Sequence, residues 1–409
     1  MKVLMITPYV TIPGRKEFER NKTGFGYMVY DIAKAVGVKH EVCVLATDSR
    51  GDSFCRDGVL FLRRSFWLMM KYFVRCIKWG DVRQLLKKYP VGKGARIRLW
   101  YYWAMSGYVR DLICTGCYDV VHIHGCAISD EIWMSICRKT GVRFLITLHG
   151  LNSFNDTISL EAAGKQYERD FLQRVVNYEF PITVISTGIK RIIERAYGIV
   201  ECKNIMVVCN SFSFDDIDNS ISLCDVRKQY NIPSKAKVLL YVGNISDNKN
   251  QRQLVEACDL LSDDLRRNTW LLFCGSPSKD GNFERMVQRS PNKDRIMLCG
   301  VIDKKSIGDY YRSANGVVLL SYSEGFGLSL IEGMHFGIPC AMFRDMDAFE
   351  DIYDEKAVVA IDNRDNMMVS VALEDLLTRD WDRQAIIANS ERFSSQEMAN
   401  KYIKAYKYE

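Results

Sequence analysis

The sequence has 409 residues, of which 48% are hydrophobic and 26% are charged, so it can form the cores of two or three soluble domains of ordinary size. No apolar run approaches the roughly 20 residues of a membrane-spanning helix, and the apolar stretch over residues 1–6 is too short for a signal peptide. Fourteen cysteines without a secretory signal indicate free thiols in a reducing cytoplasm. The net charge of +6 comes from one segment, because residues 63–110 contain twelve Lys and Arg residues and one acidic residue, Asp81.

The first half of the chain predicts a parallel α/β domain. Residues 3–6 and 40–45 have the pattern of buried strands, and between them a long polar loop leads through Gly24 to a helix over residues 27–36. Val29 stands where a dinucleotide-binding fingerprint has its third glycine, and the loop before the helix is too long for that motif. The pattern therefore disfavours a nicotinamide-binding enzyme.

Polar residues follow the later strands of this half. The strands are predicted over residues 120–123, 144–148, 183–185 and 206–209, and the polar groups at their ends are His124, His149-Gly150, Ser186 and Asn210-Ser211. Open parallel sheets bind ligands at the carboxyl edge of their strands. His149 is therefore a candidate ligand contact, although a histidine that merely caps a strand end would give the same pattern.

Two cysteines and two histidines allow an alternative interpretation as a zinc site. Cys114 and Cys117 form a C-x-x-C pair, and His122 and His124 follow shortly after. The spacing departs from the finger pattern, in which a dozen or more residues separate the two pairs, and both histidines lie on a strand that is expected to be buried. We therefore expect no metal here.

The second half predicts another parallel domain that begins near Ile232-Pro233-Ser234. Strands are expected over residues 238–242, 271–275, 296–302 and 317–320, and the first three of these reach or are followed by a glycine, at Gly243, Gly275 and Gly300. A helix over residues 396–406 closes the chain.

The most informative stretch is Ser323-Glu324-Gly325-Phe326-Gly327-Leu328, followed by Glu332. It connects a buried strand to a helix that should begin near Leu328. The glycines allow close backbone approach or positive φ, and the start of a helix offers free N–H groups to a diphosphate. Two carboxylates eight positions apart can accept hydrogen bonds from vicinal hydroxyls. This chemistry suits a nucleotide-sugar site, whereas a strand–turn–helix with solvated glutamates is the plainer alternative.

The Glu324/Glu332 pair resembles the E-x7-E signature of glycosyltransferase family 4, whose members are retaining enzymes with the two-domain GT-B fold. The resemblance implies that Glu324 lies against the donor sugar, that Glu332 binds the ribose and that Lys249 holds the diphosphate. Asn244 stands where the family has an arginine, which Arg252, Lys304 or Lys305 would have to replace. His149 resembles the family histidine that faces the sugar. The further donor contacts that the resemblance implies are Gly24, Gly243, Gly275, Val301, Ile302, Gly325, Phe326, Gly327 and Leu328.

The resemblance implies an α/β GT-B fold with two doubly wound Rossmann-like domains that face each other across a cleft. We expect an acceptor-binding domain over residues 1–211 with an insertion at 63–110, a linker at 212–234, a nucleotide-sugar domain at 235–390, and a helix at 391–409 that packs back on the first domain.

The implied reaction is the transfer of a hexose from a UDP- or GDP-sugar to an acceptor hydroxyl in surface polysaccharide or glycolipid assembly. Glu324, His149 and Lys249 form the expected catalytic set, and no metal or cofactor is implied. Because Asn244 leaves a diphosphate cation missing, the alternative is a non-catalytic GT-B protein that binds a nucleotide or a glycan.

The basic segment over residues 63–110 is also rich in aromatic residues, such as Phe66, Trp67, Trp79 and Trp100. An ordinary helix pair would explain the aromatic residues but not the scarcity of acids, and no recognised nucleic-acid-binding motif accompanies the charge. Basic helices with Trp and Phe suit an anionic membrane surface. We therefore expect a cytoplasmic protein, bound peripherally to the inner face of the cell membrane, that acts on a glycan or lipid-linked acceptor.

Overall fold

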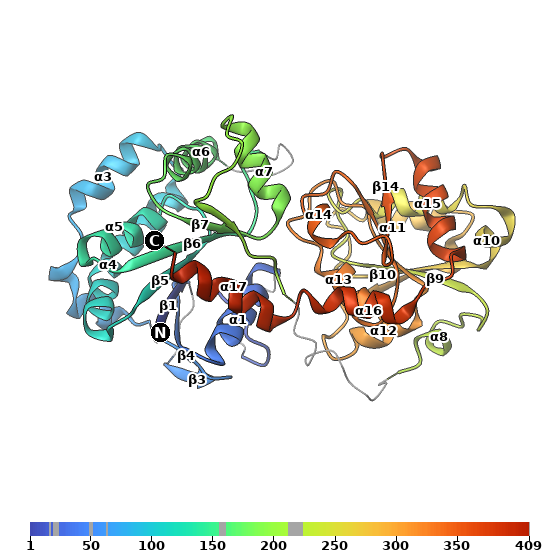
Figure 1. Ribbon diagram of the computed structural model, residues 1–409, viewed down its shortest axis with the longest axis horizontal. Helices are drawn as coiled ribbons and strands as arrows, with labels where there is room; N and C mark the ends of the chain where they lie inside the picture. The colour runs from blue at the N-terminus through green and yellow to red at the C-terminus, as the bar shows by residue number, and fades with distance from the viewer. Residues whose placement is uncertain are drawn as a thin grey trace. The chain divides into compact units, whose positions relative to one another are not determined.

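The computed structural model describes residues 1–15, 18, 24–48, 52–62, 64–154, 161–211 and 224–408. Contacts between Cα atoms divide the chain into two compact units, with Met1–Asn210 and Ser395–Glu409 in unit 1 and Ser211–Ser394 in unit 2. Each unit has helices on both sides of a parallel sheet (Figure 1). Arg63 and residues 212–223, which belong to the predicted insertion and linker, lie outside the described residues.

The described part of unit 1 is built on an eight-stranded sheet with the order β3-β4-β2-β1-β5-β6-β7-β8. All neighbouring strands are parallel except β3, which runs antiparallel to β4. Helices cover both faces of the sheet, so the central strands are almost entirely buried and mostly apolar, with His122 and His124 of β5 as buried polar residues. The strands are β1 (Lys2–Thr7), β2 (Glu41–Ala46), β3 (Phe54–Arg56), β4 (Val59–Phe61), β5 (Val120–His124), β6 (Arg143–Leu148), β7 (Ile182–Val184) and β8 (Ile205–Val207).

The helices of unit 1 include one from the far end of the chain. Helix α17 packs against α1 and β6, and its Tyr402 and Tyr406 side chains are fully buried. The elements are α1 (Gly24–Gly37), α2 (Phe66–Lys71), the 3₁₀ helix η2 (Phe73–Arg75), α3 (Trp79–Lys88), α4 (Lys93–Gly116), α5 (Asp130–Thr140), α6 (Ala162–Val176), α7 (Thr187–Ala196) and α17 (Ser395–Tyr406).

The described part of unit 2 contains a six-stranded sheet with the order β11-β10-β9-β12-β13-β14, and all of its pairs are parallel. Its strands are β9 (Lys237–Val242), β10 (Thr269–Cys274), β11 (Ile296–Gly300), β12 (Gly316–Leu319), β13 (Cys340–Phe343) and β14 (Val358–Ile361). Its helices are α8 (Val226–Gln229), α9 (Gln251–Cys258), α10 (Asp263–Asn268), α11 (Asn282–Arg289), the 3₁₀ helix η4 (Lys293–Arg295), α12 (Ile307–Ser313), α13 (Leu328–His335), α14 (Phe349–Ile352), α15 (Asn366–Thr378) and α16 (Arg383–Glu391).

The strand order reverses once near the middle of each sheet. In unit 1 the chain proceeds outward from β1 in one direction and returns to β5 on its other side; in unit 2, β9 and β12 flank the corresponding point. Loops diverge from the carboxyl ends of such a strand pair and leave a crevice, in which doubly wound proteins bind their ligands. The predicted fold class, α/β with two doubly wound parallel sheets, is confirmed.

Candidate functional site: the carboxyl edge of each sheet

The loops that follow β9 and β12 bring Lys249 and Glu324 together. The two strands are neighbours in the sheet, so residues 75 positions apart in the sequence meet at its carboxyl edge. The Lys249 ammonium forms an ion pair with the Glu324 carboxylate, which also accepts a hydrogen bond from Ser321 Oγ at 3.4 Å. Their side chains are 25% and 19% exposed, which leaves both within reach of a ligand.

Asn248 fastens these two loops to each other. Its side-chain amide donates to the Ser323 carbonyl oxygen at 2.9 Å, and its Oδ1 accepts from the Ser323 N–H at 3.2 Å. Its own carbonyl oxygen accepts from the Tyr322 N–H at 2.8 Å. The neighbours of Lys249 and Glu324 are therefore held in fixed register, so the positions of the two charged groups depend on each other.

Gly327 makes the turn from the Glu324 loop into α13. It has a φ of +94° and immediately precedes the first helical residue, Leu328. A side chain there would be strained in the left-handed region and would also approach Leu319 Cδ2 to 3.1 Å. The turn directs the free N–H groups and the positive dipole end of α13 toward the edge that carries Glu324. Gly325 lies in the same turn, and Phe326 is buried against Phe393.

Glu332 lies farther along α13 and is half-buried. The hydroxyl of Tyr311 donates a hydrogen bond to its carboxylate. Tyr311 is buried and stacks on Phe336 with a ring separation of 5.6 Å. Burial, followed by the Glu332 charge, raises the pKa of Tyr311 well above its usual value, so the phenol stays protonated and remains a donor. The hydrogen bond from the buried Tyr311 thereby fixes the orientation of one Glu332 carboxylate oxygen.

The loops after β9 and β10 approach so closely that only glycine fits at position 275. A Cβ atom on Gly275 would lie 2.1 Å from the Gly243 carbonyl oxygen and 2.8 Å from the Asn244 nitrogen. Asn244 uses its Oδ1 to accept a hydrogen bond from the Ser276 N–H at 3.1 Å. The residue at the family's arginine position is thus a link between two loops. After β11, Val301 is exposed and Ile302 is half-buried.

Two charged residues near Glu324 escaped the sequence analysis. Arg364 donates to the Ser321 carbonyl oxygen at 3.0 Å, forms an ion pair with Asp345 at 2.8 Å and stacks over the Phe343 ring. Burial, and then the charge of Glu324, raises the pKa of Asp347 to about 6. Neither residue belongs to a motif, and only the order of the strands brings the loops after β13 and β14 to this edge.

Of the suggested substitutes for the missing arginine, Arg252 pairs with Glu256 on its own helix.

In unit 1, three histidines cluster at the carboxyl edge of β5 and β6. His124 Nδ1 lies 3.2 Å from His149 Nε2, and His122 contacts Thr147 Oγ1 at 2.6 Å and the Tyr406 hydroxyl at 2.9 Å. Burial lowers the pKa of His122 to about 3 and that of His149 to about 4, so both rings are neutral at pH 7. The edge of Phe25, which follows Gly24 at the start of α1, packs on His149.

A pocket of about 230 Å³ lies beside this cluster, where β1 and β5 diverge. His124 lines it, and the buried Nε2 atom of this histidine has no hydrogen-bond partner among the described residues. The pocket is otherwise aromatic with a few polar groups, and its lining includes Tyr9, Phe25, Arg98, Tyr102, Asp130 and Trp133. This mixture of ring faces and sparse polar groups is typical of a site for a sugar or another small polar molecule.

Asp130 should make the stability of the protein depend on pH. Burial raises its pKa from 3.8 to about 7, so between these values the folded protein holds a proton that the unfolded chain has released. The contribution of Asp130 to the free energy of unfolding therefore falls as pH rises toward 7. Between pH 5 and pH 8, the free energy of unfolding of Asp130→Asn should therefore rise by about 3 kcal/mol relative to that of wild type. Thermal unfolding of both proteins at several pH values measures this gain, and parallel curves would contradict it.

The alternative zinc set is not assembled. Cys114 and Cys117 are exposed near the end of α4, whereas His122 and His124 are fully buried. Within the described ranges, no group of three or more His, Cys, Asp or Glu side chains is placed to hold a metal ion.

The family described as "Glycosyltransferase Family 4" matches residues 23–215, and the family described as "Glycosyl transferases group 1" matches residues 225–393. The chain is 22% identical over 305 residues to D-inositol 3-phosphate glycosyltransferase of Xylanimonas cellulosilytica, which covers 71% of this chain and 72% of that protein. It is 26% identical over 172 residues to O-antigen chain mannosyltransferase B of Escherichia coli, which covers 41% of this chain and 45% of that protein.

Among solved structures, the fold is similar to that of Anabaena HepE in complex with UDP. The TM-score is 0.70 with 13% sequence identity, and the match covers 100% of both chains. The fold therefore agrees with the two family matches, which together span nearly all of units 1 and 2. The chain belongs to glycosyltransferase family 4, and it is a glycosyltransferase with the GT-B fold.

Proposed function

We propose that the protein transfers a hexose from a UDP- or GDP-sugar to an acceptor hydroxyl, with retention at the anomeric carbon and without a metal ion. The ion pair between Lys249 and Glu324, beside the start of α13, carries this proposal. An ammonium group and a helix N-terminus are groups that bind a diphosphate, and a carboxylate beside them can bind sugar hydroxyls. The UDP bound to the structural neighbour HepE supports a nucleotide donor.

Each residue then has a separate task. When the donor binds, Lys249 exchanges Glu324 for the diphosphate and stabilises the charge that develops on the leaving group. The released Glu324 orients the sugar, Glu332 accepts hydrogen bonds from the ribose, and the backbone at Val301 and Ile302 contacts the base. In unit 1, the neutral His149 is the third member of the proposed catalytic set.

The acceptor is a glycan or a lipid-linked sugar in the assembly of a surface polysaccharide or glycolipid. The similarity to O-antigen chain mannosyltransferase B supports this class of product. The 230 Å³ pocket in unit 1 has room for one sugar ring, with aromatic walls and Arg98 among its polar lining residues.

The Glu324→Gln variant tests the function. It removes the charge that positions the sugar but leaves Glu332 and Lys249 in place, so turnover should fall about tenfold, equivalent to 1.4 kcal/mol, while nucleotide affinity stays within a factor of two. Release of UDP or GDP from nucleotide sugars, measured with a lipid-linked acceptor, gives the turnover, and calorimetry gives the affinity. Donor binding without nucleotide release in wild type would indicate a non-catalytic binding protein, and equal turnover would remove Glu324 from the site.

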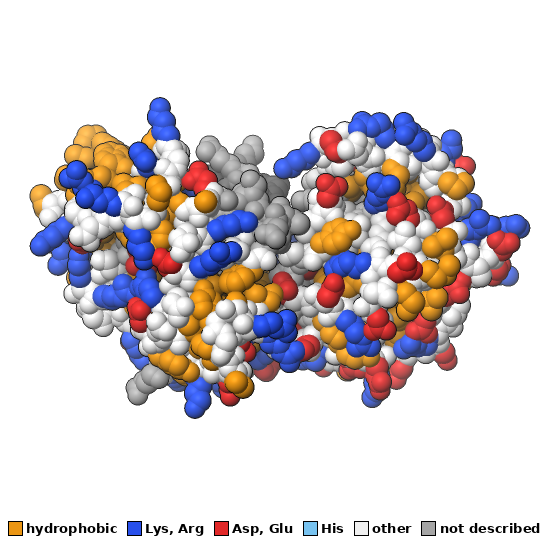
Figure 2. All heavy atoms as spheres, turned by 90° about the horizontal axis from the view of Figure 1, so that it is seen from above, with side chains coloured by type: hydrophobic (Ala, Val, Ile, Leu, Met, Phe, Trp, Pro, Cys, Tyr) orange, Lys and Arg blue, Asp and Glu red, His pale blue; other side chains and the backbone are white. Residues whose placement is uncertain are grey.

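We further propose that α2, α3 and α4 dock unit 1 on the anionic cytoplasmic face of a membrane. These helices and η2 between them expose large apolar side chains, among them Phe66, Trp67, Val74 and Trp100, and Trp67 is 78% exposed. Figure 2 shows hydrophobic and basic side chains intermingled at the end of unit 1 where α3 and α4 lie. No helix in the described residues is long and apolar enough to cross a membrane.

The charges that would act on the membrane differ from those that the sequence suggests. Arg75 pairs with Asp111, and Lys88 pairs with Asp170, so both are partly neutralised. Lys78, Arg83 and Lys87 are exposed and form no ion pair with any described residue. Each of these three contributes about 1 kcal/mol of electrostatic attraction to an anionic surface.

Replacing Lys78, Arg83 and Lys87 with Glu should weaken binding to vesicles containing anionic lipid by about 100-fold or more. Flotation with anionic and neutral vesicles, at low and high salt, measures the effect. The matched control replaces three exposed basic residues elsewhere in unit 1, Lys39, Arg143 and Lys203, with Glu. Equal losses in both triple variants, or binding indifferent to lipid charge, would contradict this docking surface.

A further inference from the structure

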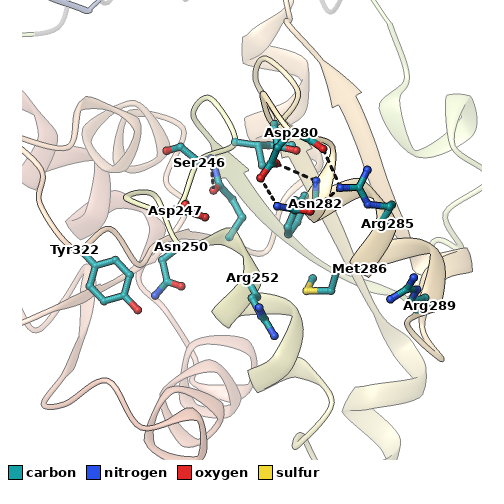
Figure 3. Close-up of a pocket in the computed structure, with 14 residues that line it drawn as sticks. Ser246, Asp247, Asn250, Arg252, Asp280, Asn282, Arg285, Met286, Arg289 and Tyr322 are labelled. Atoms are coloured by element: carbon teal, nitrogen blue, oxygen red, sulfur yellow. Dashed lines mark hydrogen bonds between the residues drawn. The ribbon is translucent and has the colours of Figure 1, made fainter. Parts of the chain in front are cut away.

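Unit 2 contains a pocket of about 540 Å³ that is lined by residues on both sides of Lys249 in the sequence but not by Lys249 itself (Figure 3). Its walls are the loop from Ile245 to Gln251, the start of α9, the segment that leads into α11, and Tyr322 from the Glu324 loop. Apart from Arg252, which was suggested as a substitute for the missing diphosphate arginine, none of the residues predicted to bind the donor is among the described residues that line it. The pocket is therefore distinct from the donor site, although both share the same two loops.

The lining indicates the chemistry of a ligand. Ile245, Phe283 and Met286 provide an apolar surface, and three arginines stand around it, with Arg252 on α9 and Arg285 and Arg289 on α11 (Figure 3). Arg289 is exposed and has no hydrogen-bond or ion-pair partner among the described residues.

The other charged groups in the pocket are partly engaged, and two of them, Asp247 and Asp280, are carboxylates. Arg285 donates to the Asp280 carbonyl oxygen at 2.9 Å and to Asn282 Oδ1 at 2.6 Å. Arg252 pairs with Glu256 one turn along its own helix, where its side chain is 72% exposed, so this pair contributes little and is easily exchanged. The Asp280 carboxylate accepts hydrogen bonds from the backbone and side-chain amides of Asn282. Guanidinium groups bind phosphate and carboxylate through two parallel hydrogen bonds, so the pocket fits a small molecule with an apolar part and such a group.

The pocket is connected mechanically to the donor site. Gln251, only 1% exposed, accepts from the Ser246 N–H at 3.3 Å and donates to the Asn244 carbonyl oxygen at 3.1 Å. Through Asn248 the same loop is bonded to Tyr322 and Ser323, next to Glu324. A ligand that contacts Ser246 or Tyr322 therefore touches the segments that position Lys249 and Glu324.

We propose that this pocket is a second ligand site, which binds a small molecule bearing a phosphate or carboxylate group and strengthens donor binding through the two loops that both sites share. The binding itself is independent of the proposed function, whereas the effect on the donor rests on it. Because coupling between two sites is reciprocal, the donor must strengthen anion binding by the same factor.

Titration of the full chain with inorganic phosphate and, separately, with citrate tests the site and distinguishes the two ligand classes. In wild type at least one of them should bind saturably by calorimetry and raise the unfolding temperature. Arg252→Ala combined with Arg289→Ala should weaken this binding at least tenfold, and Met286→Trp, which fills the pocket without removing charge, should weaken it similarly. Arg267→Ala removes an exposed arginine of α10 outside the pocket and should change nothing.

Lys249→Ala separates the two sites, because an anion could also occupy the donor site. Binding that persists in Lys249→Ala and disappears in the double variant supports the second site. Binding lost in Lys249→Ala and kept in the double variant, or no saturable binding of either probe, overturns it. For the coupling, the bound probe should raise UDP or GDP affinity three- to tenfold in wild type and not in the double variant; an unchanged affinity overturns the coupling. If neither nucleotide binds at all, the proposed function fails while anion binding remains measurable.

Discussion

Replacing Lys249 with Ala should lower kcat/KM for the nucleotide sugar by about 100- to 1,000-fold, the usual cost of removing one group that stabilises developing charge. The expected loss is large because Asn244 does not supply the second cation: its side chain is an amide bonded to Ser276. In the proposed reaction, Lys249 is therefore the cation that the loop after β9 offers to a leaving diphosphate, and α13 contributes only its partial charge.

The measurement is nucleotide release from the preferred sugar donor. Lys356→Ala is the matched control, since this exposed lysine of unit 2 lies outside the site. Lys249→Ala also removes the ammonium partner of Glu324. The unfolding temperature of Lys249→Ala should therefore be recorded, so that a loss of folded protein is not mistaken for a loss of catalysis. A folded Lys249→Ala protein with wild-type kcat/KM would show that the diphosphate is held elsewhere, for which Arg364, bonded to the Ser321 carbonyl oxygen near Glu324, is a candidate.

Glu332→Ala should weaken nucleotide binding by about 10- to 150-fold, because hydrogen bonds to a charged group contribute about 1.5–3 kcal/mol. The change removes the acceptor of the ribose hydroxyls but leaves Lys249, Glu324 and the turn at Gly327 in place. Titration calorimetry with UDP and GDP measures the loss and also identifies the base.

Tyr311→Phe provides the comparison for this prediction. It removes the hydroxyl that orients Glu332 and keeps the ring that stacks on Phe336. Its effect should be smaller than that of Glu332→Ala, because the carboxylate remains. Unchanged affinity in a folded Glu332→Ala protein would place the ribose outside α13.

The parts of the fold that follow short-range patterns could be predicted from the sequence. The apolar run 317–320 matches β12 to within one residue, and the start of α13 at Leu328 agrees with the structure. Both follow from local chemistry, since a strand buried on both faces must be apolar and a helix preceded by a tight turn needs glycine. The Glu324/Glu332 pair could be predicted for the same reason, because both glutamates belong to one strand–loop–helix segment and their spacing is visible in the sequence.

The contacts that link distant segments could not be predicted. Nothing near Asn248 in the sequence indicates that it bonds to Ser323, 75 residues away, and Arg364 reaches the Glu324 loop only because β13 and β14 extend the sheet beyond β12. The ion pairs of Arg75 with Asp111 and of Lys88 with Asp170 could not be predicted either, because both acidic residues lie beyond the end of the basic segment at residue 110. Such contacts depend on the order of strands and the packing of helices, which local patterns do not encode.

The placement of α17 in unit 1 sets the order in which the protein matures during synthesis. Residues 1–210 leave the ribosome first, but the Tyr406 hydroxyl that bonds His122, and the surface of α1 that α17 covers, must wait until residues 395–406 have been made. Unit 2 is continuous in the sequence and can fold in the meantime. The N-terminal unit is thus completed last, and the nascent chain carries an uncovered apolar face on α1 through most of translation, which is when chaperones would be expected to engage it.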